Sequence, residues 1–164
     1  MFLVFDTETT GLPKKWNAPV SDVDNWPRCV QLAWQLHDSK GDLISNNNYI
    51  INPENFDIPY EAEKIHGIST DLGRKIGKNI NEVLDLFISD FNKAGFLVGH
   101  NLKFDINIIG SELFRIGNKN DISEKDVLDT CSELTANVCK LPGGRGGKFK
   151  FPTSIEIYSN LFDE

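Results

Sequence analysis

The sequence has few residues that crosslink a chain or anchor it in a membrane. Its three cysteines lack the CxxC spacing of a thiolate zinc site. Because three is an odd number and no disulfide framework is indicated, we expect reduced structural thiols. No window approaches the ~18 consecutive apolar residues of a membrane span, and no basic segment precedes an apolar run near Met1. These features predict a soluble, cytoplasmic protein without a membrane partner.

An excess of positive charge is also missing. The chain has 17 lysines and arginines against 24 acids, a net charge of −7. This excludes a protein that holds nucleic acid through a broad basic surface, because such binding depends on neutralising many phosphates. An acidic chain still suits an enzyme that grips only the last few nucleotides, since divalent cations can neutralise phosphate charge there.

The first half of the chain contains strand patterns and one long loop. With 40% apolar and 25% charged residues, the 164 residues predict one globular domain, 1–164. The apolar run Phe2–Phe5 predicts a short strand buried on both faces. In residues 29–36 apolar and polar side chains alternate, which predicts a strand, and residues 43–51 are predicted to form its hairpin partner. The stretch between Gly11 and Pro27 has no clear period and is predicted to be a loop.

The second half alternates helices and strands. Apolar spacing predicts a helix from Ile80 that is capped by Asn79 or Asn81 and ended by Gly95. The remaining predicted elements are a strand at 96–98, a helix at 102–116, a strand at 127–130, a basic glycine-rich loop at 141–151 and a helix capped by Thr153 or Ser154. This order predicts an α/β domain with a mixed sheet.

Two acids lie where the first strand ends. Residues two apart on a strand face the same side, so Asp6 and Glu8 should project together while Thr7 points away. Adjacent carboxylates repel unless a cation compensates, and hard oxygen donors select Mg²⁺ or Mn²⁺. Taken alone, the pair is equally compatible with a strand that emerges into solvent.

The run from Asp6 to Pro13 resembles the first motif of the DEDD exonuclease family, to which the proofreading epsilon subunits of bacterial replicative polymerases belong. Gly99–Asp105 resembles the second motif of that family. Ile65–Ser69 resembles the segment that closes over the terminal nucleotide, and Val127–Thr130 the strand that follows the second-motif helix. The resemblance implies a ribonuclease H-like fold: a mixed five-stranded sheet flanked by helices.

The resemblance also implies a reaction and a site. Asp6, Glu8 and Asp105 would be catalytic carboxylates that hold two divalent cations, Mg²⁺ or Mn²⁺. The reaction would release nucleoside 5′-monophosphates from the single-stranded or frayed 3′ end of DNA, or of RNA, with a polymerase as a further partner. The implied substrate-binding residues are Thr7, Thr9, Thr10, Leu12, His66, Gly67, Ile68, Asn101 and Phe104.

Several of these residues also have a plainer structural interpretation. Asp105 is equally explained as a first-turn acid stabilised by the helix dipole, His66 as a loop residue bonded to backbone, and Asn101 as a helix cap. For Phe104 we favour packing over stacking. Asp129 occupies a position where the family often carries a structural acid. In the long loop, Trp16 and Trp26 are either a stacking platform or buried anchors.

The third motif of the family is not in the sequence. It would supply a fourth acid, preceded by a histidine or a tyrosine, but no histidine follows His100. Asp163 and Glu164 lie near the right place in order but follow no histidine, so we do not assign them. We therefore expect an exonuclease domain that is incomplete at its C-terminus, with the last helix truncated or missing, and nearly inactive by itself. The alternative is a noncatalytic module that keeps the fold and binds nucleic acid or a polymerase.

Overall fold

The computed structural model describes residues 1–162, so Asp163 and Glu164 lie outside the described part of the chain. Five strands form one sheet: β1 (Phe2–Thr9), β2 (Cys29–His37), β3 (Leu43–Ile50), β4 (Phe96–Gly99) and β5 (Asp126–Asp129). The helices are α1 (Tyr60–His66), α2 (Thr70–Ile76), α3 (Ile80–Phe91), α4 (Leu102–Arg115), α5 (Glu133–Cys139) and α6 (Ser154–Phe162), and a short 3₁₀ turn, η1, spans Arg145–Gly147.

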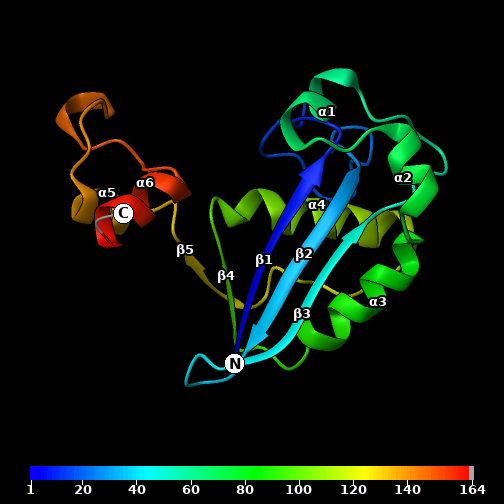
Figure 1. The fold of residues 1–164 in the computed structure, drawn as a ribbon, viewed down its shortest axis with the longest axis horizontal. Coiled ribbons are helices and arrows are strands. Elements are labelled where there is room, and N and C mark those ends of the chain that lie inside the picture. The colour runs from blue at the N-terminus through cyan, green and yellow to red at the C-terminus, as the bar shows by residue number, and fades with distance from the viewer. Residues whose placement is uncertain (163–164) are drawn as a thin grey trace.

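The sheet is mixed, in the order β3-β2-β1-β4-β5. β1 pairs antiparallel with β2, and β2 pairs antiparallel with β3. β4 runs parallel to β1, and β5 runs parallel to β4. This confirms the predicted mixed five-stranded sheet. Because β1 and β4 are parallel neighbours, their carboxyl ends meet at one edge, and α1 lies near the arrowhead of β1 (Figure 1).

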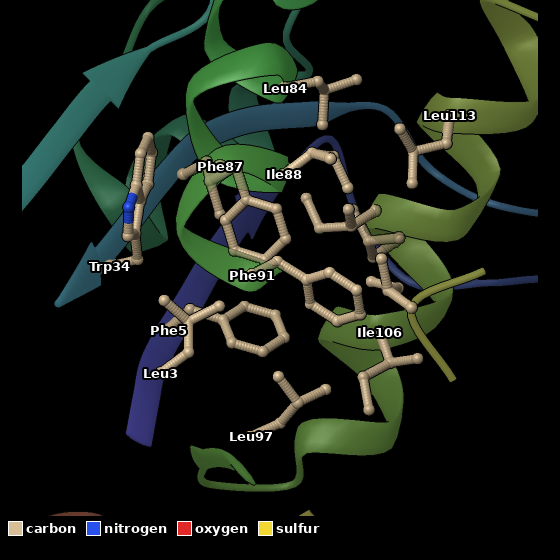
Figure 2. Packing of buried hydrophobic residues seen from close by; sticks show 14 of the residues in the cluster. Leu3, Phe5, Trp34, Leu84, Phe87, Ile88, Phe91, Leu97, Ile106 and Leu113 are labelled. Carbon is tan, nitrogen blue, oxygen red and sulfur yellow. The ribbon is translucent and has the colours of Figure 1, made fainter. Parts of the chain in front are cut away.

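The main core lies between one face of the sheet and helices α3 and α4. Phe87 is fully buried at its centre, and its ring meets those of Phe5 and Trp34 edge-on at centroid distances of 5.2 and 5.6 Å. Leu3 of β1 and Leu97 of β4 extend the same layer (Figure 2). Edge-on aromatic packing adds to the hydrophobic burial, so α3 and α4 are fixed against the strands that carry the motif residues.

Most predicted elements are present, with two differences in their bounds. β1 continues through Asp6 to Thr9 instead of ending at Phe5. Its burial on both faces was a wrong prediction, because Val4 is 37% exposed. Helix α3 ends at Phe91, short of Gly95, and its N-cap is Asn79, which accepts a hydrogen bond from the Asn81 amide.

Helices α1, α2 and α5 were not predicted. Each has seven residues, which is too short to show a clear helical period. Their end signals are nevertheless present in the sequence. Gly67 ends α1 in the left-handed conformation, Ser69 caps α2 through Leu72, and Ser132 opens a capping box on α5.

Two lysines of the basic glycine-rich loop form ion pairs with acids elsewhere in the chain. Lys148 pairs with Glu133 at 2.7 Å and Lys150 with Glu156 at 2.6 Å. These ion pairs connect the loop to α5 and α6, so both lysines have acidic partners within the chain. Within residues 1–162, no helix has the length and apolar character needed to cross a bilayer.

Candidate active site

Asp6 and Glu8 lie on the same side of strand β1, as the two-residue repeat of a strand requires. Thr7 is buried on the side that faces the helices, whereas Asp6 is exposed and Glu8 half-buried on the opposite side. The pairing with β2 shifts register between Glu8 and Thr9. Such an irregularity bends the strand locally, directly after the acid pair, although Thr9 still pairs with Cys29.

Asp105 comes from the first turn of α4 and is 3% exposed. Its Oδ1 accepts hydrogen bonds from the Thr7 backbone amide at 3.0 Å and from the Thr7 hydroxyl at 2.6 Å. Both contacts fall on one oxygen, so Thr7 leaves the second oxygen of the carboxylate free. The two bonds join α4 to β1 between the two acids of the strand.

The three carboxylates influence one another electrostatically. The pKa of Asp105 is raised to about 7, mainly by burial and in part by the charge of Asp6, against the lowering effect of the Thr7 hydrogen bonds. Desolvation also raises the pKa of Glu8, again with a contribution from Asp6. The pKa of Asp6 is raised by desolvation, against the lowering effects of the Thr7 amide and of His100. Clustered acids that resist ionisation are characteristic of sites that bind a cation.

His100 lies beside the acid pair at the end of β4. Its Nδ1 is 3.0 Å from the Thr130 hydroxyl, which donates a hydrogen bond to the Gly99 carbonyl. Asp6 and His100 both line a hollow of about 490 Å³ on the sheet face opposite α3 and α4, and Ser154 at the start of α6 lines it too. Asp6 therefore faces an open space bordered by polar side chains.

The described residues contain no group of three or more His, Cys, Asp or Glu side chains positioned to hold a metal ion. Asp105 is buried, and its Oδ1 accepts two hydrogen bonds from Thr7. Asp6 and Glu8 do fit a hard divalent cation, because they are oxygen donors on one side of β1 with raised pKa values that a cation would lower. The arrangement thus fits direct binding by two carboxylates, with Asp105 just behind them.

A cavity of about 360 Å³ brings together most of the predicted substrate-binding residues. Six of them line it with Glu8: Thr7, Thr9, Thr10, Leu12, His66 and Phe104. The segment that follows β1 forms one wall, and Pro59, Glu61 and Ile65 at α1 form another. Two stretches of the chain more than forty residues apart therefore enclose one space next to an acid of the candidate site.

His66 is held in one tautomer at the end of α1. Its Nδ1 accepts a hydrogen bond from the Ile68 amide at 3.1 Å, so the ring hydrogen is on Nε2. Nε2 is buried and has no hydrogen-bond partner in the described part of the chain. A buried donor without a partner costs free energy, which makes it a candidate contact for a ligand in the cavity.

Three predicted substrate-binding residues do not line this cavity. Gly67 is the left-handed C-cap of α1, with φ of 77°, and Ile68 is 5% exposed in a small core beneath it. Asn101 is exposed and left-handed, with φ of 60°, and its side chain makes no capping hydrogen bond.

Asp129 has the structural role that was considered for it. Its Oδ1 accepts from the amides of Asn101 at 2.8 Å and Cys131 at 2.7 Å, and its Oδ2 accepts from the amide of Leu102 at 3.0 Å. The start of α4 is therefore capped by an acid from β5 and not by the side chain of Asn101. This capping sets the position of the helix that carries Asp105.

The long loop between β1 and β2 is fixed to α4 by Glu112, which sequence analysis did not identify. Glu112 is 1% exposed and accepts from the Cys29 amide and from Arg28, both at 2.9 Å. Arg115 lies 3.1 Å from the same oxygen and donates to the carbonyls of Val23 and Trp26 at 2.7 Å. Glu112 follows Asp105 by seven residues, about two helical turns, so both acids lie on one face of α4. This spacing is the feature of the sequence that could have identified Glu112.

Comparison with known proteins identifies the family. The family model described as RNase_T exonuclease matches residues 3–143. Among curated proteins, the chain is similar to the DNA polymerase III epsilon subunits of Rickettsia prowazekii, at 28% identity over 145 residues, and of Treponema pallidum, at 32% over 129 residues. The matches cover 87% and 79% of this chain but 57% and 53% of those proteins, so the chain spans about half the length of the curated relatives it matches.

Solved structures agree in fold. E. coli exonuclease I in complex with a dT13 oligonucleotide has a TM-score of 0.69 at 20% identity, covering 92% of this chain and 33% of that protein. Its complex with a dA16 oligonucleotide has a TM-score of 0.68 at 18% identity, covering 97% and 38%. Because one family model accounts for residues 3–143, this chain belongs to the RNase_T exonuclease family, with the ribonuclease H-like fold of the DEDD exonucleases.

Proposed function

We propose that this chain is part of the exonuclease domain of a 3′–5′ exonuclease that releases nucleoside 5′-monophosphates from single-stranded or frayed 3′ ends, and that it is nearly inactive by itself. The observation that carries the proposal is the cavity that Glu8 shares with the first-motif segment and His66. DNA is the favoured substrate, because the similar structures of exonuclease I contain DNA oligonucleotides and the similar curated proteins are DNA polymerase subunits. A polymerase is accordingly the proposed protein partner.

The proposed metal ligands are Asp6, Glu8 and Asp105. Asp6 and Glu8 would hold Mg²⁺ or Mn²⁺ directly, and Asp105 would support the second ion directly or through a water molecule, with the oxygen that Thr7 does not occupy. When bound, two such ions activate water and stabilise the leaving 3′ oxygen. A bound cation would offset the desolvation that raises the pKa of all three carboxylates, which is greatest for buried Asp105.

The protein side chains would position the terminal nucleotide. Thr9, Thr10 and Leu12 form one wall of the cavity, so they are placed to contact its base and sugar. His66 would donate the Nε2 hydrogen to a nucleotide oxygen from the opposite wall, which satisfies the buried donor. Gly67 and Ile68 would act indirectly, by fixing the imidazole of His66 through the end of α1.

Release of mononucleotides from 5′-labelled single-stranded DNA and RNA in Mn²⁺ tests the proposal. The assay compares this chain with a form extended by the next several dozen residues of its gene, where the resemblance predicts the third motif. Asp6→Ala should abolish release by the active form. Asp85→Ala removes an exposed carboxylate from α3 and is the matched control, with release expected to be unchanged.

Persistent release by the Asp6→Ala variant would contradict the assignment of the site. Absence of release from every form, together with binding of oligonucleotide, would favour the alternative of a noncatalytic module. The acid cluster argues against that alternative, because carboxylates held together without a cation are costly for a scaffold.

A further inference from the structure

The three tryptophans of this chain are in different environments. Trp34 is 2% exposed in the core, and Trp26 is 3% exposed, with its indole N–H bonded to the Pro19 carbonyl at 3.1 Å. Trp16, in the same loop as Trp26, is 51% exposed. Trp26 is therefore a buried anchor of the loop, whereas burial does not account for the position of Trp16.

The exposed indole lies at the mouth of the candidate site. The rings of Trp16 and Phe104 are 5.8 Å apart between centroids and tilted by 51°. Phe104 is half-buried and lines the cavity that contains Glu8 and His66. Through its contact with Phe104, Trp16 thus continues the aromatic wall of that cavity outward to solvent.

The backbone beside Trp16 is held firmly. The side chain of Asn25, which is 5% exposed, accepts from the Lys15 amide at 2.7 Å and donates to the Lys15 carbonyl at 3.0 Å. The Lys14 amide also donates to the Asn25 carbonyl at 3.2 Å. A ring attached to a fixed backbone loses little conformational entropy when a ligand stacks on it, so Trp16 is already placed for binding.

The charges around the ring suit an anionic ligand. Lys14 and Lys15 immediately precede Trp16, are exposed, and form no ion pair within the described residues. Free cations beside an exposed aromatic ring are the combination with which proteins bind single-stranded nucleic acid, where the bases stack and the phosphates are neutralised. This local positive charge contrasts with the net charge of −7 for the chain.

We propose that Trp16 stacks on a nucleobase of the single strand just outside the terminal-nucleotide cavity, with Lys14 and Lys15 near the adjoining phosphates. The inference rests on the proposed function, because it requires a nucleic-acid strand whose 3′ end lies beside Glu8. It assigns a strand-binding contact upstream of the reacting bond. Stacking on a π-face is sequence-tolerant, so this contact would bind all four bases.

Tryptophan fluorescence of the chain tests the inference without requiring hydrolysis. A single-stranded oligothymidylate of roughly eight nucleotides, within the span that one such site covers, is titrated in Ca²⁺. Emission from exposed Trp16 should fall at the red side of the spectrum, while Trp26 and Trp34 remain as buried internal references. Binding of the same oligonucleotide, labelled at its 5′ end, is measured in parallel by anisotropy.

Substitutions of Trp16 separate the contribution of base stacking from nonspecific binding of the oligonucleotide. Trp16→Leu should weaken binding about 5- to 150-fold, the range expected for loss of one stacked base. Trp16→Phe should restore most of the affinity because it restores a ring. Phe114→Leu alters a similarly exposed aromatic, 52% exposed and near the other end of α4, and should bind like the wild type.

Equal binding by the wild type and Trp16→Leu, or unchanged emission at saturation, would overturn the inference while leaving the proposed function intact. Failure of the wild type to bind oligonucleotide at all would overturn both. The two failures are distinguishable, because only the second removes wild-type binding in the anisotropy measurement.

Discussion

Replacement of Asp105 by asparagine should stabilise the metal-free protein at neutral and higher pH. The folded protein raises the pKa of Asp105 from 3.8 to about 7, with burial as the main cause. Asparagine keeps an oxygen that can accept the two Thr7 hydrogen bonds but has no charge to desolvate. The variant therefore removes the electrostatic cost and retains the contact between α4 and β1.

The sign and size of the effect follow from linkage. Between pH 4 and 7 the folded carboxyl binds a proton that the unfolded one has lost, so the stability of the wild type falls as pH rises through this interval. A rise in pKa from 3.8 to about 7 corresponds to a change on the order of 4 kcal/mol at ~1.36 kcal/mol per unit. The stability advantage of Asp105→Asn should grow across this interval by up to that amount and then level off.

Urea unfolding of both proteins in EDTA, at intervals from pH 4 to 9, measures the difference in free energy of unfolding. Mn²⁺ added at pH 8 should stabilise the wild type more than Asp105→Asn, since we propose that the ion binds the carboxylates of the folded protein. A difference between the two proteins that stays constant with pH would refute the reasoning. So would an Asp105→Asn variant that is less stable than the wild type at pH 8.

Three further predictions concern stability. Glu112→Gln should lower the free energy of unfolding by about 3 kcal/mol, because two arginines lose a buried counter-charge. Glu133→Gln, which breaks an exposed ion pair, should leave the urea midpoint nearly unchanged in the same titration. Asn25→Ala should speed tryptic cleavage after Lys15, and an unchanged cleavage rate would show that the loop is held by other contacts. Phe87→Ala should cost ~3–5 kcal/mol in thermal unfolding, and a loss below ~1 kcal/mol would contradict its central position in the core.

The spacing of apolar residues was sufficient to predict an element where that element was long or regularly patterned. Residues 29–36 alternate and α4 repeats its apolar residues every three or four positions, so both were predicted within about a residue of their bounds. The seven-residue helices α1 and α5 show no such period. The exposure of Val4 could not be predicted either, because an apolar strand residue does not reveal whether anything covers its face.

The sequence proposes the candidate site as a set of residues, whereas the geometry of that site comes from the structure alone. Local strand geometry gave the common orientation of Asp6 and Glu8. The contact between Asp105 and Thr7 joins positions 98 residues apart, and it depends on how α4 crosses β1. The exposure of Trp16 and the burial of Trp26 were left as alternatives, because both residues belong to one loop without a period.

The capping of α4 by Asp129 has a practical consequence for protein engineering. One carboxylate on the last strand of the sheet accepts three amide hydrogens, two of which belong to Asn101 and Leu102. A chimaera that grafts β1 and α4 onto another scaffold must therefore also carry the segment 126–131. Without it, the transplanted helix would lose its cap, and Asp105 would no longer be held in position against Thr7.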